Sequence, residues 1–252
     1  MNIPIDQLWL EAVMLAGVRI AAFLVIAPPF SHNAIPLRIK GILAVGLSLA
    51  VSPAVTRNYA ARDLGGFILA LVLELATGAV LGFLVMVVYS AVMSAGSLID
   101  LFGGFQMASA FDPQGMINGA QFTRLFQMAA VALLFASDGY QVVLGGLAGT
   151  FGALPLGGGL DLTSPVQAMI HAFSGMFLAA LQIAGPLAVV LFLADVGLGL
   201  VTRVAPALQA FQLGYVLKIF ITLALGTAVF TALPRVVAAL TGQVGALLTG
   251  VR

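Results

Sequence analysis

The stretch LATGAVLGFLVMVVYSAVMSAGSLI, Leu75 to Ile99, decides the fold, because it contains no charged side chain. A helix that crosses a bilayer needs about 20 consecutive, mostly apolar residues. The stretch lies inside a longer apolar region, Leu64 to Leu101, in which Glu74 is an early interruption. It also carries Gly78 and Gly82, a spacing that lets two helix backbones approach closely. We therefore expect an all-α membrane protein with tightly packed helices.

The composition of the 252-residue chain agrees with this expectation, since 62% of the residues are hydrophobic and only 8% are charged. Soluble domains carry about 25% charged residues. The net charge of +1 leaves no basic face for phosphates, so we expect no nucleic-acid partner. Cysteine is absent, which excludes disulfides and thiolate metal sites. Asp6 and Glu11 flank the first apolar run in place of a basic region, so we expect no cleaved signal peptide.

Six regions are apolar enough to cross a membrane, although some are short. Pro186 predicts a kink in the fifth region. Apolar residues at helical spacing after Pro234 predict a short terminal helix. Glycines between Gly139 and Leu160 predict a short helix over 140–154 and then a turn, so we expect broken or re-entrant segments. The six regions are about 8–30, 39–55, 64–101, 121–136, 165–193 and 208–233.

Ionisable residues inside the apolar regions are candidates for function, because such groups usually face a bundle interior or a cavity. Arg19, Glu74, Asp195 and Lys218 are of this kind. We favour structural pairing over ion transport, with snorkelling as a further interpretation of Lys218. Arg38, Lys40 and Arg203 fall in loops that six crossings would place on one side. The positive-inside rule predicts that this side is cytoplasmic and that both termini lie outside.

Catalytic motifs are not evident in the chain. It contains no H-E-x-x-H, no G-x-S-x-G and no Walker A loop. The aspartates raise the alternative of an intramembrane aspartyl protease, which needs two carboxylates that share a proton. Four of the five lie beside Gly, Pro or loop boundaries, where Asp is a normal cap or turn residue. We therefore expect no enzyme and no cofactor. The five are Asp100, Asp112, Asp138, Asp161 and Asp195.

The segment GGFQMASAFDPQGMINGAQFTR, Gly103 to Arg124, breaks the apolar pattern at the centre of the chain. Asp112-Pro113 biases the chain away from helix, and four glycines permit turns. Its Phe and Met side chains are bulky or adaptable. The segment therefore suits either a loop that blocks a passage and then moves, or an ordinary surface connection between helices. A stand-alone secondary transporter is another alternative, with a midplane site at Gly103-Gly104 and Gly157 to Gly159.

The run AGSLIDLFGGFQMASAFDPQG, Ala95 to Gly115, followed by RLFQMAAVALLFASDGY, Arg124 to Tyr140, resembles the FliR family of flagellar export-gate proteins. The related SctT family belongs to injectisome secretion systems. Arg19 to Pro53 is similar to the family's first hairpin, and Leu198 to Ile219 to its last. Two departures are Asp138-Gly139-Tyr140, where the family commonly has Asn-Gly-His, and Tyr215-Val216, where it often has Phe-Pro. The form FDPQ favours flagellar membership.

The resemblance implies a structural, pore-forming subunit of a type III protein export gate in the bacterial inner membrane and flagellar basal body. Such a subunit joins FliP-like and FliQ-like proteins, contacts an FlhB-like protein on the cytoplasmic side, and lies largely above the bilayer plane in contact with lipid. Unfolded export substrates would pass through the gate. The chain would be one domain, 1–252, with a FliP-like part, 1–195, and a remainder, 196–252, that completes a FliQ-like last hairpin.

The resemblance also implies the site residues. A loop over about 106–121 would plug the closed channel, with Phe105, Met107, Phe111 and Met116 as candidate sealing side chains. The predicted plug residues are Phe105, Gln106, Met107, Phe111, Asp112, Pro113, Gln114, Met116 and Asn118. Arg203, Pro206 and Lys218 would flank the cytoplasmic tip of the last hairpin and contact a partner there.

Overall fold

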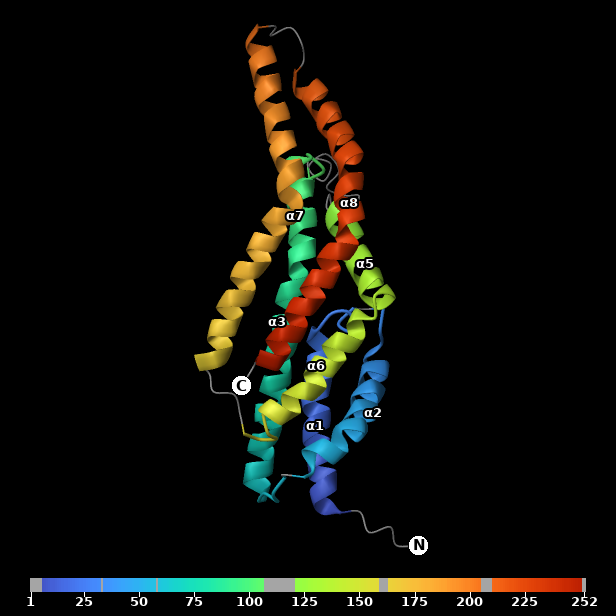
Figure 1. Cartoon of the computed structure of the whole chain (residues 1–252), viewed down its shortest axis with the longest axis vertical. Coiled ribbons are helices and arrows are strands. Elements are labelled where there is room, and N and C mark those ends of the chain that lie inside the picture. Colours follow the sequence, from blue (N-terminus) through green and yellow to red (C-terminus); the bar gives the residue numbers. More distant parts are fainter. Residues whose placement is uncertain are drawn as a thin grey trace, which may run out of the picture. The chain divides into compact units, whose positions relative to one another are not determined.

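The computed structural model describes residues 6–32, 34–57, 59–106, 121–158, 163–204 and 210–250, without the side chains of 163–165 and 210–213. Over these ranges the chain forms helices and no strand (Figure 1). The predicted all-α fold is therefore confirmed. The helices are α1 (Gln7–Ile26), α2 (Leu37–Val55), α3 (Leu64–Phe102), α5 (Gln121–Ala136), α6 (Gly139–Ala153), α7 (Thr163–Val204) and α8 (Ala210–Gly250).

The helices belong to two compact units. Unit 1 contains residues 1–88, 134–173 and 238–252, and unit 2 contains residues 89–133 and 174–237. Each passage of the chain from one unit to the other falls inside a helix, in α3, α5, α7 and α8 in turn. The units therefore alternate along the chain. The predicted division into a FliP-like and a FliQ-like part at residue 195 is a different kind of division and stays a prediction.

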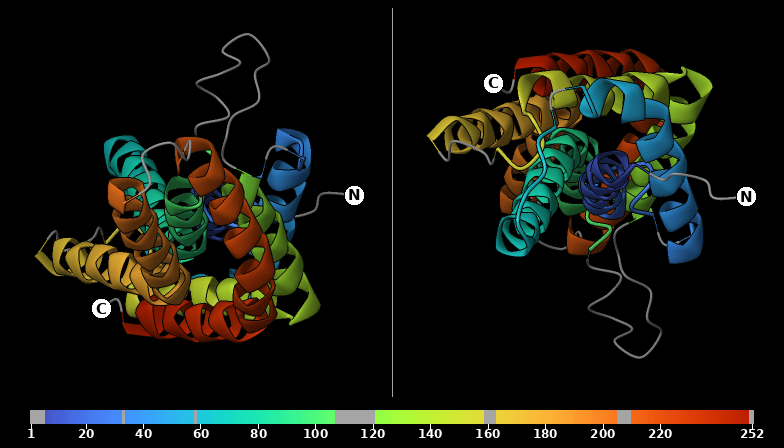
Figure 2. Two further views of the ribbon diagram at one scale, coloured as in Figure 1. Left: turned by 90° about the horizontal axis from the view of Figure 1, so that it is seen from above. Right: turned by 90° about the horizontal axis from the view of Figure 1, so that it is seen from below.

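Helix α1 forms the centre of unit 1, between α2 and the first part of α3 (Figure 2). Leu15, Ile20 and Phe23 are fully buried along it. The Asp6 carboxylate caps the helix by accepting a hydrogen bond from the Leu8 backbone N–H at 3.1 Å. The helix ends at Ile26, earlier than the predicted end near Phe30, because Ala27 is already extended before the two prolines that follow it.

Gly78 and Gly82 of α3 pack directly on α1. A Cβ atom on Gly78 would collide with the Arg19 carbonyl oxygen, and one on Gly82 would lie 3.0 Å from the Phe23 carbonyl oxygen. Neither backbone oxygen can move aside as a side chain could. The spacing of the two glycines therefore allows close packing of two helices, as the sequence predicts. The structure identifies α1 as the helix that packs against them.

The last two helices are longer than predicted. Helix α7 continues from Thr163 past Pro186 to Val204, beyond the predicted end at Leu193. Helix α8 runs through Pro234 to Gly250, so the separate terminal helix predicted after that proline is wrong. Proline inside an apolar helix removes one backbone hydrogen bond but need not end the helix, because neighbouring groups can satisfy the freed carbonyl.

Five of the described helices, namely α1, α2, α3, α7 and α8, are long and apolar enough to cross a membrane. Helices α5 and α6 qualify only together, as a pair bent at a short break, which would bring the number of spans to six. Asp138 occupies this break in the left-handed conformation, with φ of 54°. The predicted number of spans and the predicted broken segment therefore agree with the structure.

Candidate functional site

The two ends of the central segment come together in unit 2. Helix α3 ends at Phe102, a turn follows over 103–106, and α5 begins at Gln121. Of the predicted plug residues, Phe105 and Gln106 are described. Met107, Phe111, Asp112, Pro113, Gln114, Met116 and Asn118 lie outside the described residues. The structure therefore describes the two segments from which the predicted plug extends. They are the end of α3 with the turn over 103–106, and the beginning of α5. We call these two segments the stems.

The Asp100 carboxylate joins the two stems. It lies in the last turn of α3 and is fully buried. Its Oδ1 accepts a hydrogen bond from the Phe122 backbone N–H at 2.9 Å. Its Oδ2 accepts two more, from the Thr123 N–H at 2.9 Å and the Thr123 hydroxyl at 2.8 Å. The first N–H groups of a helix lack partners within it, so Asp100 caps α5 from another helix.

Two glycines, one inside α3 and one directly after its end, allow this close approach. A Cβ on Gly96, one turn before Asp100, would lie 2.7 Å from the Thr123 Cα and 2.9 Å from the Phe122 carbonyl oxygen. A Cβ on Gly103 would lie 2.8 Å from the Thr222 hydroxyl of α8. Glycine at both positions therefore lets α3 sit directly against α5 and α8.

Aromatic side chains complete the junction. The Phe105 and Phe122 rings meet edge to face, with centroids 5.3 Å apart, and Phe122 also contacts Phe126 at 6.2 Å. Gly104 adopts φ of 81°, a conformation that favours glycine, and faces the Tyr215 ring of α8. We call the cluster that joins the stems the loop base. Its members are Gly96, Asp100, Gly103, Phe105, Phe122 and Thr123.

The predicted hairpin tip lies between α7 and α8. Arg203 is exposed in the last turn of α7, where a cation complements the helix dipole. Pro206 lies outside the described residues. Lys218 is in the second part of the hairpin, and its Nζ lies 2.8 Å from Asp195 Oδ2 of α7. Lys218 and Asp195 are thus an ion pair, in agreement with the favoured interpretation of structural pairing.

A second ion pair, formed by the other two of the four predicted intramembrane residues, is in unit 1. Arg19 of α1 donates from Nε to Glu74 Oε2 at 2.5 Å and from Nη2 to Glu74 Oε1 at 3.0 Å. Both side chains are 1% exposed. A buried ion pair needs additional hydrogen bonds to offset its desolvation. The Gly157 N–H supplies one to Glu74 at 2.7 Å, and the Leu154 carbonyl accepts one from Arg19 at 3.0 Å.

The chain around residues 154–158 is therefore held by charged side chains from two helices. The Arg19 guanidinium also lies 4.4 Å from the centroid of the Phe151 ring, within the range of a cation–π contact. Arg62, which precedes α3, donates to the Leu156 carbonyl at 3.0 Å and the Gly157 carbonyl at 3.3 Å. Sequence reasoning missed Arg62, because an arginine in a connection between two apolar regions gives no signal of its partner.

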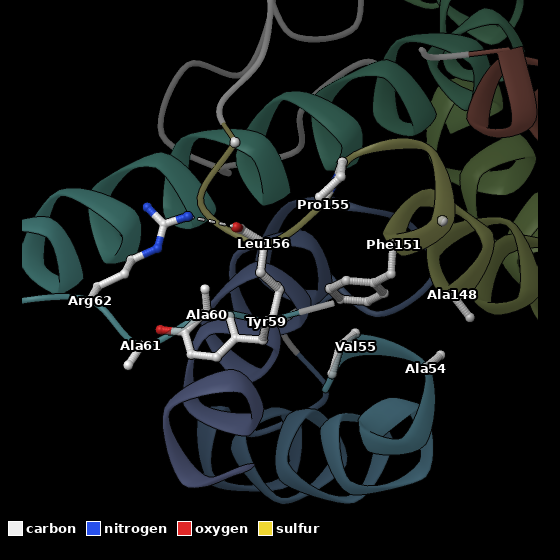
Figure 3. A pocket seen from close by; sticks show the side chains of 12 residues that line it. Ala54, Val55, Tyr59, Ala60, Ala61, Arg62, Ala148, Phe151, Pro155 and Leu156 are labelled. Atoms are coloured by element: carbon white, nitrogen blue, oxygen red, sulfur yellow. Dashed lines mark hydrogen bonds between the residues drawn. The ribbon is translucent and has the colours of Figure 1, made fainter. Parts of the chain in front are cut away.

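A cavity of about 570 Å³ lies beside this chain segment, within unit 1 (Figure 3). Its walls come from the end of α2, the connection to α3, and the end of α6. Figure 3 shows Arg62 reaching the Leu156 carbonyl along one side, with Tyr59 and Phe151 on others. The Tyr59 hydroxyl donates to Glu11 at 3.1 Å. Burial, this hydrogen bond and the Glu11 charge raise the pKa of Tyr59, although the Arg62 charge partly opposes them.

Two of the five aspartates considered for proteolysis, Asp100 and Asp195, have separate partners. Asp100 accepts three hydrogen bonds at the loop base, and Asp195 pairs with Lys218. Two carboxylates that share a proton would instead face one another. Among the described residues no group of three or more His, Asp or Glu side chains is arranged to hold a metal ion.

Comparison with known proteins supplies the context for this geometry. Residues 10–244 match the family described as bacterial export proteins, family 1. The chain belongs to this family. The match to family 1 includes the loop base, the Arg19–Glu74 pair and the α7–α8 ion pair, because all of these residues lie within 10–244.

Relatives of this family 1 member are similar over most of their length. The flagellar biosynthetic protein FliR of Escherichia coli (strain K12) is 30% identical over 91% of this chain and 87% of its own. The protein of the same name from Bacillus subtilis (strain 168) is 30% identical over 88% and 86%. Yop proteins translocation protein T of Yersinia pestis is 28% identical over 79% and 78%. The resemblance to the FliR family is therefore confirmed.

Proposed function

We propose that this chain is the FliR-type subunit of a flagellar type III export gate. The observation that carries the proposal is the family match over residues 10–244, together with FliR proteins that are 30% identical over about nine-tenths of the chain. Similarity to a Yop translocation protein supports the wider class of type III secretion. The form FDPQ at 111–114 favours the flagellar branch. Its apolar helices support a location in the bacterial inner membrane, and its similarity to FliR proteins supports a location in the flagellar basal body.

The central segment, about 106–121, is proposed to plug the closed channel. Support comes from the loop base, which returns the chain after residue 120 to within hydrogen-bonding distance of the end of α3. A segment fixed at both ends can occupy a pore without being lost from it. Because Phe105 packs on Phe122, we expect Met107, Phe111 and Met116 to supply more of the seal.

The gate subunit is proposed to act without catalysis, with energy for export supplied elsewhere. Its proposed partners are FliP-like and FliQ-like subunits, an FlhB-like protein at the tip around Arg203, Pro206 and Lys218, unfolded export substrates, and lipid. The proposed complex holds the chain largely above the bilayer plane. The stand-alone transporter and the intramembrane protease are not advanced, because family membership favours an export component.

Deletion of residues 111–115 tests the plug in cells that lack the native gene and carry all other gate components. We expect the variant to assemble and to leak ions, measured as loss of membrane potential, because the seal is shortened while the loop base remains. Replacement of Asp138 by Asn is the matched control, since Asp138 is exposed and left-handed and asparagine tolerates that conformation. Unchanged ion leak together with unchanged export of flagellar substrates would refute the plug.

Native mass spectrometry tests membership of the gate. Co-expression with FliP-like and FliQ-like proteins should give one stable hetero-oligomer that contains a single copy of this chain. A chain that never co-purifies with those proteins would remove the proposed function, whatever the central segment does.

A further inference from the structure

The Asp100 carboxylate is suited to hold the loop base in a way that few side chains could. Each of its oxygens accepts from the α5 terminus, and all three donors belong to Phe122 and Thr123. A carboxylate is an acceptor only, so it can satisfy all three donors at once. An asparagine has an NH₂ group in place of one carboxylate oxygen. This group would face at least one of the N–H donors and could not accept a hydrogen bond from it.

The charge on Asp100 has compensation at its buried position. An isolated buried carboxylate is costly, but hydrogen bonds to the charged form and the positive end of a helix both stabilise it. The three donors and the first turn of α5 provide both. The attraction acts across the gap between α3 and α5. It therefore holds together the two places at which the central segment leaves the helices.

We propose that Asp100 is a positioning residue that keeps the two stems closed and thereby seats the central segment in the channel. The position of the central segment in the channel rests on the proposed function. The closing of the stems depends only on contacts within the loop base. Helix packing supports the stems independently, since Phe122 also lies against Gly226 of α8 and Tyr215 lies against Gly104. Loss of Asp100 should therefore loosen the loop base without unfolding unit 2.

Stem closure can be measured directly, because the chain has no cysteine of its own. A Phe105→Cys, Phe122→Cys chain places one thiol in each stem, at positions whose rings are 5.3 Å apart. The gate is purified with its partner subunits and oxidised with copper phenanthroline, and the rate of intrachain disulfide formation is followed by mass spectrometry. The same measurement is made after adding Asp100→Asn, with Asp138→Asn as the matched control.

We expect Asp100→Asn to lower the rate of disulfide formation at least fivefold and Asp138→Asn to leave it unchanged. Thr123→Val removes one hydrogen bond to Oδ2 and keeps the Asp100 charge, so it should give an intermediate decrease. This variant also serves if Asp100→Asn reduces assembly. An unchanged rate in both Asp100→Asn and Thr123→Val, with assembly intact, would overturn the proposal.

Ion leak then separates this proposal from the function on which it rests. In cells, Asp100→Asn with the cysteine pair should leak, oxidation should suppress the leak, and a reductant should restore it, because the disulfide replaces the carboxylate bridge. Slower disulfide formation without a leak would support the role of Asp100 in the loop base and refute the plug. A leak that oxidation does not suppress, despite full disulfide formation, would refute seating through the stems.

Discussion

The Arg19–Glu74 pair acts at the scale of single residues, because it joins α1, α3 and the chain after α6 through four hydrogen bonds. Both charges are fully buried, so each interacts with the other in place of water. Removing one partner would leave the other charged and without its counter-charge, whereas removing both would leave mainly a packing defect. The pair therefore specifies which segments meet.

Replacement of Glu74 by Gln should destabilise the chain by about 3–5 kcal/mol, the cost of breaking a buried pair. The double replacement Arg19→Met, Glu74→Gln should be less damaging than Glu74→Gln alone, because it leaves no buried charge. Thermal unfolding in detergent, followed by size-exclusion profile, measures both. Equal losses in the single and double variants would show that the pair does not carry this energy.

The Tyr59 hydroxyl makes a contribution to stability that depends on pH. Its raised pKa means that deprotonation is harder in the folded chain than in the unfolded one. The contribution is present below the ordinary tyrosine pKa of about 10 and is lost as pH rises through the higher folded pKa. The stability difference between the parent and Tyr59→Phe should therefore shrink above about pH 10 in thermal unfolding at pH 7 to 11. Parallel curves would contradict this.

At the scale of elements, Gly78 determines how closely α3 approaches α1. Replacement of Gly78 by Ala should separate the helices, because the added Cβ meets the Arg19 carbonyl, and should cost about 1–3 kcal/mol. Gly41→Ala on α2 is the matched control in the same unit, since nothing lies within 4 Å of its added Cβ. Thermal unfolding should show a loss for the first variant and none for the second. Similar values for the two would disprove close packing at Gly78.

The sequence predicted the elements best where strong breakers end them. Helices α2, α3, α5 and α6 begin and end within about two residues of the prediction, since prolines, glycines and charges surround them. Helix α7 was predicted too short because Asp195 and two nearby glycines resemble an end, whereas Lys218 neutralises Asp195 and the helix continues. Helix α8 passes Pro234, because a proline inside a long apolar helix removes one backbone hydrogen bond without necessarily ending the helix.

The sequence predicted what kind of interaction the site residues make, but it did not predict which residues are their partners. The general interpretation of the aspartates as cap or turn residues fits Asp100, yet its hydrogen bonds reach Phe122, which lies 22 residues further along the chain. Pairing of Arg19 and Glu74 was likewise expected as a type, but the partners are 55 residues apart. Only the packed fold brings such positions together. The plug residues between 107 and 120 and the partner contacts at the hairpin tip stay predictions.

At the scale of the whole molecule, the apolar surface left on α7 and α8 is the main feature. In the most apolar stretches of these helices 28% and 17% of residues are buried, against 50% in α1 and α3 and 22% in the shorter helix α2. Large exposed apolar surface on a protein indicates a partner or a membrane. In the proposed gate, FliP-like and FliQ-like subunits would cover part of it.

Single cysteines at Phe177 and Phe220, which are 64% and 69% exposed, can detect this cover. We expect both to react with a maleimide in the isolated chain in detergent and to lose most of this reactivity in the complex with FliP-like and FliQ-like subunits. Leu191→Cys is the control that should stay unreactive throughout, because Leu191 is fully buried. Equal labelling of Phe177→Cys and Phe220→Cys with and without partners would assign this surface to lipid.

The alternation of the two compact units along the chain has a consequence for the gene. Every passage between the units lies inside a helix, at residues 88–89, 133–134, 173–174 and 237–238. No cut in the coding sequence therefore releases either unit whole, and any truncation at a unit boundary leaves a severed helix. Recombination that replaces one unit by the corresponding unit of a relative would need four crossovers, each within codons that encode helix residues. Neither unit can therefore be cut out of the chain, or exchanged, as one continuous segment.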